Sequence, residues 1–361
     1  MAALHVIAAI LGVLLIAVVF WETFETLVLP RRVDRRLRLT RIYFRGFWRV
    51  WSGVGRGSSG PRREKYLSVF APLSLLFLFG LWALGVIIGF GLLQWGLQLA
   101  ITGHLAGGFG TYLYLSATTF WTLGLGDVTP LTSPGRAITA VEAGMGFAFL
   151  ALAISYLPVM YQAFSRREVR ISMLDQWAGS PPSAMEIFRR ATQFGDLASV
   201  NGLLADWELW AAELLESHLS YPILAWFRSQ HDNQSWLAAL TTILDASALA
   251  LTGVDGISPW QARRTFAMAR HAVVDLAQVL ADRYEPTEHM RPDDRSSLRD
   301  GLEAAGVGLH PRMEERLAPY RRMYEPYAHA LSHRLQMPLP PFAAGIGGPD
   351  DWETSGWTIP G

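Results

Sequence analysis

The chain has 361 residues, no net charge at neutral pH, 51% hydrophobic residues and 17% charged residues. This composition is apolar for a soluble protein of this size, and the zero net charge identifies no partner. The chain has no cysteine, which excludes disulfide bonds, thiolate metal sites and cysteine nucleophiles.

Three stretches are long enough to cross a bilayer, which needs roughly 20 apolar residues in a helix. Residues 1–21 carry no charge, residues 69–99 lie inside a long uncharged stretch, and residues 137–165 carry only Glu142. The first stretch could also be a cleaved signal peptide, but it lacks a basic start and is followed by arginines, which favours a retained anchor. We therefore predict an all-α membrane protein with three transmembrane helices.

Lys and Arg are concentrated after the first stretch, because 12 of the 31 lie in residues 31–65, where only two acids oppose them. By the positive-inside rule this segment is cytoplasmic. We expect the N-terminus outside and the C-terminus in the cytoplasm, in the plasma (inner) membrane. Arg166 and Arg167, directly after the third stretch, are expected at the membrane surface, where they would couple movement of the following domain to the third helix.

These patterns divide the chain into six parts. They are an N-terminal transmembrane helix (1–30), a basic cytoplasmic linker with an amphipathic interfacial helix (31–65), a membrane unit with the second and third helices (66–165), a linker (166–182), an all-α cytoplasmic domain (183–336) and a mobile tail rich in Pro and Gly (337–361).

The basic linker has a helical pattern of its own, because Arg38, Arg41, Arg45 and Arg49 recur at helical spacing with aromatic residues on other faces. This pattern suits a helix at a membrane surface. Two interpretations remain open: the linker binds anionic lipid headgroups, or it is a solvated segment that only sets orientation. Nucleic-acid binding is not expected beside membrane spans.

The cytoplasmic domain is predicted to contain about six helices, separated by Gly and Pro breaks. Helix starts are expected at Ser183, Asp196, Asn233 and Ser258. Five tryptophans are expected to lie first in the helical core and second at a pocket or inter-subunit surface: Trp207, Trp210, Trp226, Trp236 and Trp260. Acids and histidines in residues 203–255 match no helix-face metal spacing, which favours a solvated face over a metal site.

The most informative motif lies between the second and third membrane stretches. Residues 111–121 are uncharged and lead into the hexapeptide Thr122-Leu123-Gly124-Leu125-Gly126-Asp127. Successive carbonyl groups can face one side of an extended strand only if alternate residues adopt left-handed backbone angles, which glycine permits without strain. Gly124 and Gly126 occupy such alternate positions. Irregular backbone at membrane depth must line a cavity or be buried in protein.

This Thr-x-Gly-x-Gly-Asp motif resembles the pore loop of the potassium channel superfamily, and the resemblance covers residues 66–164. It implies a homotetramer with one fourfold pore, a re-entrant pore helix and a filter loop between the second and third helices. It assigns K⁺ to the carbonyl groups of Thr122, Leu123, Gly124 and Leu125, with the Thr122 hydroxyl closing the inner site. Asp127 is placed at the outer mouth, where it attracts cations and hydrogen-bonds to the pore helix. No other cofactor and no structural metal is expected.

Two residues depart from the pattern of that superfamily. An aromatic residue usually stands where this chain has Leu125, and a small or hydroxyl residue where it has Trp121. The aromatic ring normally packs behind the filter, so its loss bears on the preference for K⁺ over Na⁺, and Trp121 is expected to supply replacement packing. Both a potassium-selective and a weakly selective monovalent cation channel remain open, with K⁺ favoured.

The third membrane stretch holds further candidates. Gly144 and Gly146 lie about where the inner helix of such channels bends, so they are expected either to act as a gating hinge or to allow tight helix packing. Pro158 is expected to kink the same helix and is a third hinge candidate. Glu142 is an acid inside a span, which is costly and therefore suggests a function. We expect it either to brace Thr118, Thr119 or a filter amide, or to be a water-exposed acid near the helix start.

The leading functional hypothesis is a passive channel gated by its helical cytoplasmic domain. The alternative is a non-conducting membrane sensor or scaffold whose helical domain binds a ligand or partner. A membrane-tethered hydrolase is the weakest hypothesis, because the chain has no Gly-x-Ser-x-Gly, His-Glu-x-x-His or phosphate-binding loop. We therefore do not expect an enzyme.

Overall fold

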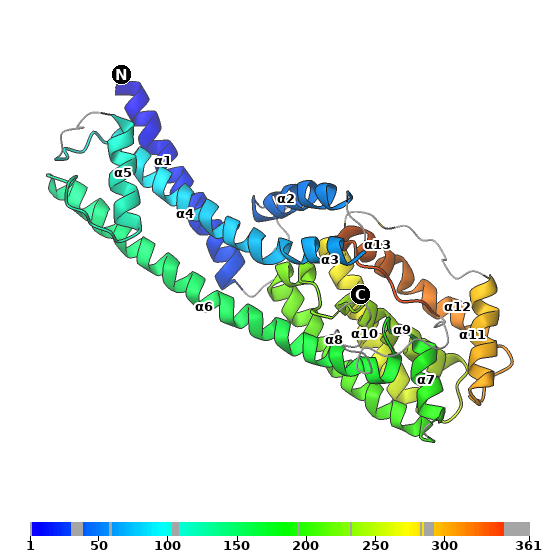
Figure 1. The fold of residues 1–361 in the computed structure, drawn as a ribbon. Helices are drawn as coiled ribbons and strands as arrows, with labels where there is room; N and C mark the ends of the chain where they lie inside the picture. The colour runs from blue at the N-terminus through cyan, green and yellow to red at the C-terminus, as the bar shows by residue number, and fades with distance from the viewer. Residues whose placement is uncertain are drawn as a thin grey trace, which may run out of the picture. The chain divides into compact units, whose positions relative to one another are not determined.

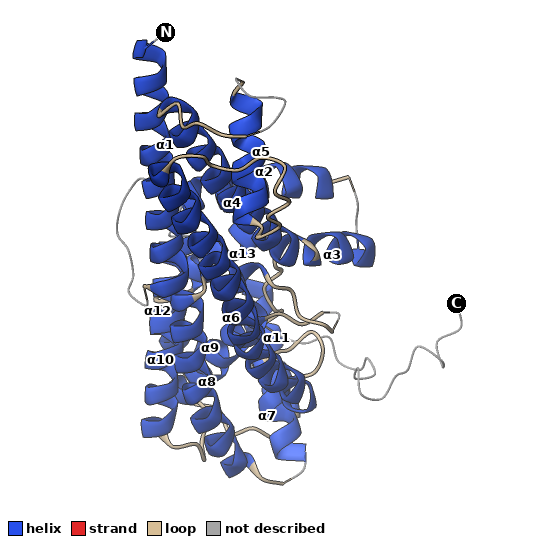
Figure 2. Cartoon of the chain, turned by 90° about the vertical axis from the view of Figure 1, so that its left-hand side faces the viewer, coloured by secondary structure: helices blue, strands red, loops and turns tan. Residues whose placement is uncertain are grey.

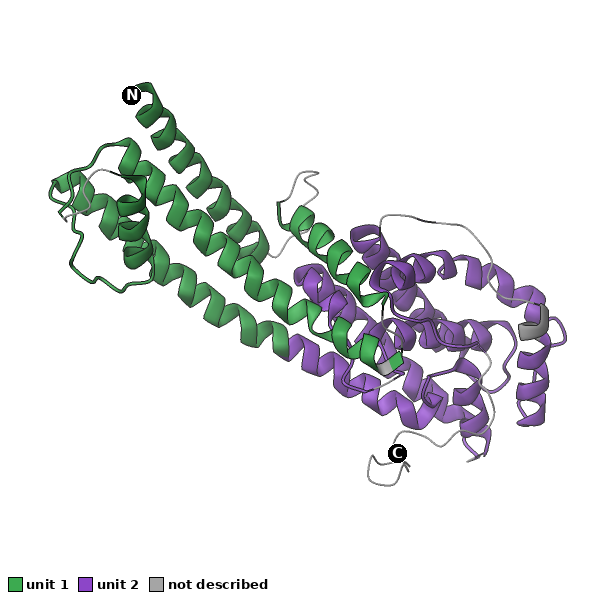
Figure 3. Cartoon of the chain, turned by 45° about the horizontal axis from the view of Figure 1, so that its top comes forward, with its two compact units in different colours: residues 1–161 green, residues 162–361 purple. Residues whose placement is uncertain are grey.

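The computed structural model describes residues 2–29, 39–57, 60–102, 108–193, 195–231, 233–281, 284 and 292–342. The regular secondary structure in these ranges is helical, as the sequence predicts (Figures 1 and 2). Three segments are long and apolar enough to cross a membrane: Ala2–Val28, Arg62–Gly96 and Ser133–Ala178. The chain divides into two compact units, unit 1 at residues 1–161 and unit 2 at residues 162–361 (Figure 3).

Unit 1 contains the membrane helices. Its elements are α1 (Ala2–Thr23), the π-helical turn η1 (Phe24–Val28), α2 (Leu39–Gly55), α3 (Gly60–Ser68), α4 (Phe70–Gly96), α5 (Phe109–Phe120) and the first part of α6 (Ser133–Ala178). The short helix α5 lies between α4 and α6 in the sequence and packs on α4.

The helices α1 and α4 pack closely through glycines. A Cβ atom on Gly96 would lie 2.4 Å from the backbone nitrogen of Ala9, and one on Gly12 would lie 2.5 Å from the carbonyl oxygen of Gly89. Small residues at such points let membrane helices approach each other. The pairing of Gly96 with Ala9 and of Gly89 with Gly12 makes the two helices antiparallel.

The helix α2 is attached to α4 by aromatic side chains. The Tyr43 hydroxyl donates to the carbonyl oxygen of Ser74 at 2.8 Å, and the rings of Trp48 and Phe70 are 4.7 Å apart. Of the arginines in the predicted basic pattern, Arg45 and Arg49 are exposed on α2 and Arg41 is half-buried, whereas Arg38 lies outside the described residues.

The start of α2 is fixed by an acid on α1. Glu22 is buried, and its Oε2 accepts hydrogen bonds from the Thr40 backbone nitrogen at 3.2 Å and from the Thr40 hydroxyl at 2.8 Å. A carboxylate at a helix N-terminus satisfies free backbone donors and complements the helix dipole. Glu22 therefore connects α1 with the basic helix.

The described residues of unit 2 form the end of α6 and seven further α-helices: α7 (Ala184–Gln193), α8 (Val200–Ser220), α9 (Trp236–Thr252), α10 (Pro259–Leu280), α11 (Pro292–Ala304), α12 (Met313–Arg322) and α13 (Glu325–Leu335). The short 3-10 helices η2 (Leu197–Ser199) and η3 (Pro222–Trp226) flank α8. The central helix is α9, which is buried along almost its whole length and contacts α7, α8, α10, α12 and α13.

Three of the four predicted helix starts have the expected caps. The side chains of Ser183, Asp196 and Ser258 accept hydrogen bonds from backbone nitrogens three residues on, at 3.3, 3.2 and 3.4 Å. The prediction at Asn233 is wrong, because Ser235 caps α9 by accepting from the Ala238 nitrogen at 3.0 Å. Asn233 instead has a left-handed backbone, with φ of 61°.

Several expected boundaries and burials differ from the structure. The expected linker at residues 166–182 is helical up to Ala178, because apolar side chains of this segment, such as Leu174, are buried in unit 2. Met337, at the start of the expected mobile tail, is buried, while residues 343–361 lie outside the described residues. Four of the five tryptophans are buried, but Trp260 is 68% exposed in the first turn of α10.

Candidate functional site

Described residues before and after α5 are hydrogen-bonded to each other. The Thr102 nitrogen donates to the Thr129 carbonyl oxygen at 2.9 Å, and the Thr129 nitrogen donates to Thr102 Oγ1 at 2.9 Å. Ile101 and Pro130 form a bridge beside this pair. The segment that contains α5 and the hexapeptide therefore leaves and rejoins the membrane helices at the same place.

The hexapeptide has the alternating backbone that its glycines predict. Gly124 has φ of 55° and Gly126 has φ of 81°, both in the left-handed region. Thr122 also has a positive φ, 55°, which is uncommon for a residue with a side chain. Every second residue from 122 to 126 is thus left-handed, the alternation that lets successive carbonyl groups face one side.

The end of α5 holds the beginning of the hexapeptide. The carbonyl oxygen of Thr118 accepts from the backbone nitrogens of Leu123 at 2.8 Å and Gly124 at 3.4 Å, and that of Thr119 accepts from the Thr122 nitrogen at 2.9 Å. Thr118 and Thr119 were expected to support the filter as partners of Glu142. In the structure they support the strand through their main-chain carbonyl groups, which need no particular side chain.

The other end of the hexapeptide is tied to the middle of α5. The Tyr114 hydroxyl donates to Asp127 Oδ2 at 2.9 Å, and Asp127 Oδ1 accepts from the Val128 nitrogen at 3.1 Å. The hydrogen bond that we expected between Asp127 and the helix preceding the hexapeptide is therefore present, and that helix is α5. Sequence reasoning missed Tyr114 as the donor, although a phenol one turn before Thr118 was a signal that could have found it.

The hexapeptide is uncovered in the single chain. All residues from Trp121 to Asp127 are exposed, including Leu123 at 61% and Leu125 at 63%. Trp121 contacts Phe120, with ring centroids 5.1 Å apart, and half of its own surface remains exposed. Within one chain, Trp121 therefore does not pack around the hexapeptide, and the side chain of Leu125 is exposed.

Glu142 has partners other than the expected ones. It is 0% exposed, so the interpretation as a water-exposed acid is wrong. One carboxyl oxygen accepts from Gln94 Nε2 at 2.8 Å, and the other is hydrogen-bonded to the Ser116 hydroxyl. The expected brace to Thr118, Thr119 or a filter amide is absent, because Glu142 lies beside the middle of α5 and not its end. The carboxyl group instead joins α4, α5 and α6.

The two glycines of α6 differ in their surroundings. A Cβ on Gly146 would lie 2.1 Å from the carbonyl oxygen of Phe120, whereas nothing lies within 4 Å of a Cβ on Gly144. Gly146 is therefore needed for close packing of α6 against the end of α5. Pro158 lies inside α6, which remains helical from Ser133 to Ala178.

Arg167 lies within unit 2, where it is only 4% exposed, although we expected it at a membrane surface. Its guanidinium donates to the carbonyl oxygens of Leu224 and Phe227, each at 2.9 Å, and Nη1 lies 3.2 Å from His218 Nε2. Burial and the adjacent guanidinium hold the pKa of His218 well below its usual value. These contacts fix the end of α6 to α8 and η3.

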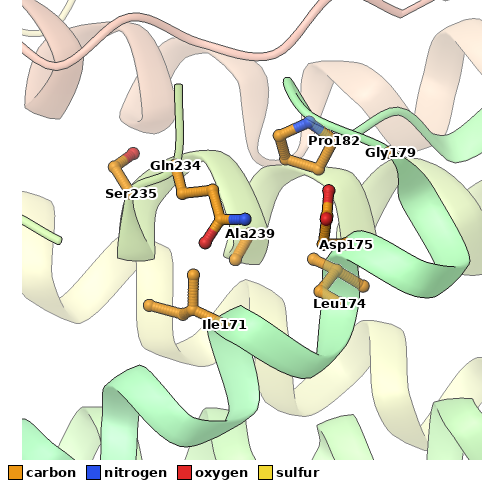
Figure 4. A pocket seen from close by; sticks show the side chains of 8 residues that line it. All are labelled: Ile171, Leu174, Asp175, Gly179, Pro182, Gln234, Ser235 and Ala239. Atoms are coloured by element: carbon orange, nitrogen blue, oxygen red, sulfur yellow. The ribbon is translucent and has the colours of Figure 1, made fainter. Parts of the chain in front are cut away.

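A small pocket in unit 2 offers no room for a ligand (Figure 4). It lies among the end of α6, the turn that follows it and the start of α9. Its lining residues are Ile171, Leu174, Asp175, Gly179, Pro182, Gln234, Ser235 and Ala239. The space does not accommodate a water molecule, so it is a gap in the packing and not a binding site.

Residues 77–163 match a family model that is described as an ion channel. The match begins within α4, ends within α6 and includes α5 and the hexapeptide. It covers none of the helices α7 to α13. Neither a curated protein nor a solved structure matches the chain.

Proposed function

We propose that this protein is a potassium-selective, or weakly selective, monovalent cation channel that conducts passively through a fourfold pore, because residues 77–163 match the ion channel family model. The observation that carries the proposal is the alternation of left-handed residues at Thr122, Gly124 and Gly126. This backbone can direct the carbonyl groups of residues 122–125 to one side, where carbonyl oxygens replace the water around a cation.

A homotetramer is the assembly that we propose. Each chain has one hexapeptide, which is exposed in the single chain although irregular backbone at membrane depth must be covered or line a cavity. An apolar stripe on α6 is also uncovered in the single chain, where Phe147, Leu150 and Ile154 are exposed. Four copies arranged around an axis would cover both surfaces and place four hexapeptides around one ion path.

Selectivity depends on how firmly the strand is held. The complete Thr-x-Gly-x-Gly-Asp frame favours K⁺. Leu125 provides no hydrogen bond behind the strand, but the bond between Tyr114 and Asp127 ties its outer end to α5 at 2.9 Å. We propose that this bond partly replaces the missing aromatic side chain, with Asp127 attracting cations at the outer mouth.

We also propose that unit 2 gates the pore through α6. This helix continues from Gly146, beside the end of α5, to Ala178 without interruption. Arg167 holds the last turns of α6 in unit 2, so a rearrangement of α8 or η3 would be transmitted to the same helix. In this arrangement the N-terminus is outside the plasma (inner) membrane, the C-terminus is cytoplasmic and residues 31–65 meet anionic lipids.

The test is ion flux into liposomes that contain the purified protein, first under a K⁺ gradient and then under a Na⁺ gradient. Gly124→Ala should abolish flux, because alanine is strained at φ of 55°. Gly110→Ala is the matched control, since its φ is ordinary and nothing lies within 4 Å of the added Cβ. K⁺ flux without Na⁺ flux supports selectivity, and equal fluxes support a pore weakened at Leu125. Flux that persists in Gly124→Ala contradicts the proposed ion path.

A further inference from the structure

The carboxyl group of Glu142 is fully buried, and among the described residues its hydrogen-bond partners are the uncharged side chains of Gln94 and Ser116. The helices packed around it contribute few titratable groups: none on α4, and on α5 only Tyr112 and Tyr114. The hydroxyls of these tyrosines donate to the Leu99 carbonyl oxygen at 2.8 Å and to Asp127 at 2.9 Å. On α6 itself, the nearest cationic side chain is Arg136, which donates to the Pro130 carbonyl oxygen. An ionised carboxylate buried without a cation is strongly disfavoured.

The hydrogen bonds around Ser116 require one more proton than the serine supplies. Ser116 Oγ lies 2.7 Å from the carbonyl oxygen of Ile87 and is also hydrogen-bonded to Glu142 Oε1. A serine hydroxyl carries one hydrogen, and the carbonyl oxygen can only accept. If Ser116 donates to Ile87, then a hydrogen on Glu142 must donate to Ser116. Gln94 Nε2 donates to the other carboxyl oxygen, Glu142 Oε2, at 2.8 Å. In a neutral acid this oxygen is the carbonyl oxygen, which can accept that hydrogen bond.

From this geometry we infer that Glu142 carries a proton at neutral pH. We call its hydrogen bonds a proton-dependent clip, because they join α4, α5 and α6 only while the carboxyl group is protonated. The chain of donors runs from Gln94 on α4 to Glu142 on α6, from there to Ser116 on α5, and back to Ile87 on α4. One proton thus completes a ring that joins the outer, pore and inner helices. Glu142 is a positioning residue, since it contacts α5 and not the hexapeptide.

Loss of this proton would open the ring at Ser116. The single hydrogen of the hydroxyl could then be donated either to Ile87 or to the carboxylate, so Ser116 would lose one of its two hydrogen bonds. Because the end of α5 holds the strand through the carbonyl oxygen of Thr118, the clip supports the proposed ion path. This part of the inference rests on the proposed function. Ion flux should therefore fall as the pH rises, by about tenfold for each pH unit beyond the midpoint of the titration.

The proton itself is tested by infrared spectroscopy of the full-length protein in liposomes. A protonated carboxyl group has a carbonyl stretching band well separated from those of carboxylates. We expect such a band at neutral pH, its disappearance in alkaline buffer, and its loss in Glu142→Gln. The same band in Ser116→Ala should be shifted, since its hydrogen-bond acceptor is removed. A spectrum in which Glu142→Gln removes no protonated-carboxyl band would overturn the inference.

Flux measurements provide the second test. Glutamine at position 142 can donate to Ser116 and accept from Gln94, so Glu142→Gln should conduct as well as the natural chain and lose its alkaline sensitivity. If the natural chain and Glu142→Gln lose flux equally in alkali, the clip does not control the pore. The infrared result does not depend on conduction, so a protein that shows the band but passes no ions would contradict the proposed channel and leave the proton on Glu142 established.

Discussion

Gly146 of α6 lies against the last residue of α5, since a Cβ on Gly146 would lie 2.1 Å from the carbonyl oxygen of Phe120. We expect Gly146→Ala to push α6 away from the end of α5, at a cost of about 1–3 kcal/mol for overpacking. Ion flux should fall together with the unfolding temperature. Gly144→Ala is the control, because its Cβ would meet nothing within 4 Å. Equal effects of the two substitutions would favour a hinge role over packing.

Tyr114→Phe removes the hydroxyl that donates to Asp127 at 2.9 Å. A hydrogen bond of this kind contributes about 0.5–1.5 kcal/mol, or up to 3 kcal/mol when one partner is charged. We expect little change in folding but a lower ratio of K⁺ to Na⁺ flux, because the outer end of the strand is released. Tyr284→Phe, whose side chain is exposed in unit 2, serves as the control. A Tyr114→Phe protein with an unchanged flux ratio would show that this bond does not maintain selectivity.

The first helix is expected to depend on the glycines of α4. Gly96→Ala would place a Cβ 2.4 Å from the Ala9 nitrogen, so α1 must separate from α4. Gly80→Ala, on the same helix, would meet nothing within 4 Å. We expect a lower unfolding temperature only for Gly96→Ala, measured on the full chain in detergent. An unchanged unfolding temperature in Gly96→Ala would mean that α1 is not held at this contact.

Arg167→Met tests the attachment of α6 to unit 2. The substitution removes the hydrogen bonds from the guanidinium to the carbonyl oxygens of Leu224 and Phe227, and a hydrogen bond with a charged donor contributes about 1.5–3 kcal/mol. Arg166→Met is the matched control, because the neighbouring side chain is exposed. We expect a large drop in the unfolding temperature, followed by tryptophan fluorescence, for Arg167→Met alone. Altered flux in that variant would further support gating through α6.

His218 predicts how stability depends on pH. Its pKa in the folded chain is held well below the usual value of about 6.5, first by burial and then by Arg167. Below about pH 6.5, His218 therefore binds a proton in the unfolded chain but not in the folded chain. The free energy of unfolding then decreases as the pH falls, by about 1.4 kcal/mol per pH unit. His218→Gln should flatten this dependence. A natural chain that is as stable at about pH 5 as at about pH 7 contradicts the assignment.

Local patterns predicted much of the structure. The three membrane helices follow from uninterrupted apolar stretches. Three helix starts follow from Ser183, Asp196 and Ser258, whose side chains accept from the backbone nitrogen three residues later. The positive φ angles at Gly124 and Gly126 likewise follow from the residue type and spacing. These features depend on interactions within a few residues, and therefore the sequence determines them directly.

The tertiary structure decided which residues meet across the fold. Glu142 could be recognised as unusual, but its partners Gln94 and Ser116 lie 48 and 26 residues away, and only the packing of α4, α5 and α6 brings them together. Gly144 and Gly146 are the same residue type two positions apart, and only the position of the Phe120 carbonyl oxygen distinguishes their surroundings. The sequence by itself determined the helices, the hexapeptide and its alternating backbone, because these depend on local conformation. Burial of Arg167, exposure of Trp260 and the proton-bearing ring at Glu142 depend on the neighbours supplied by distant segments, and these were decided only when the helices packed.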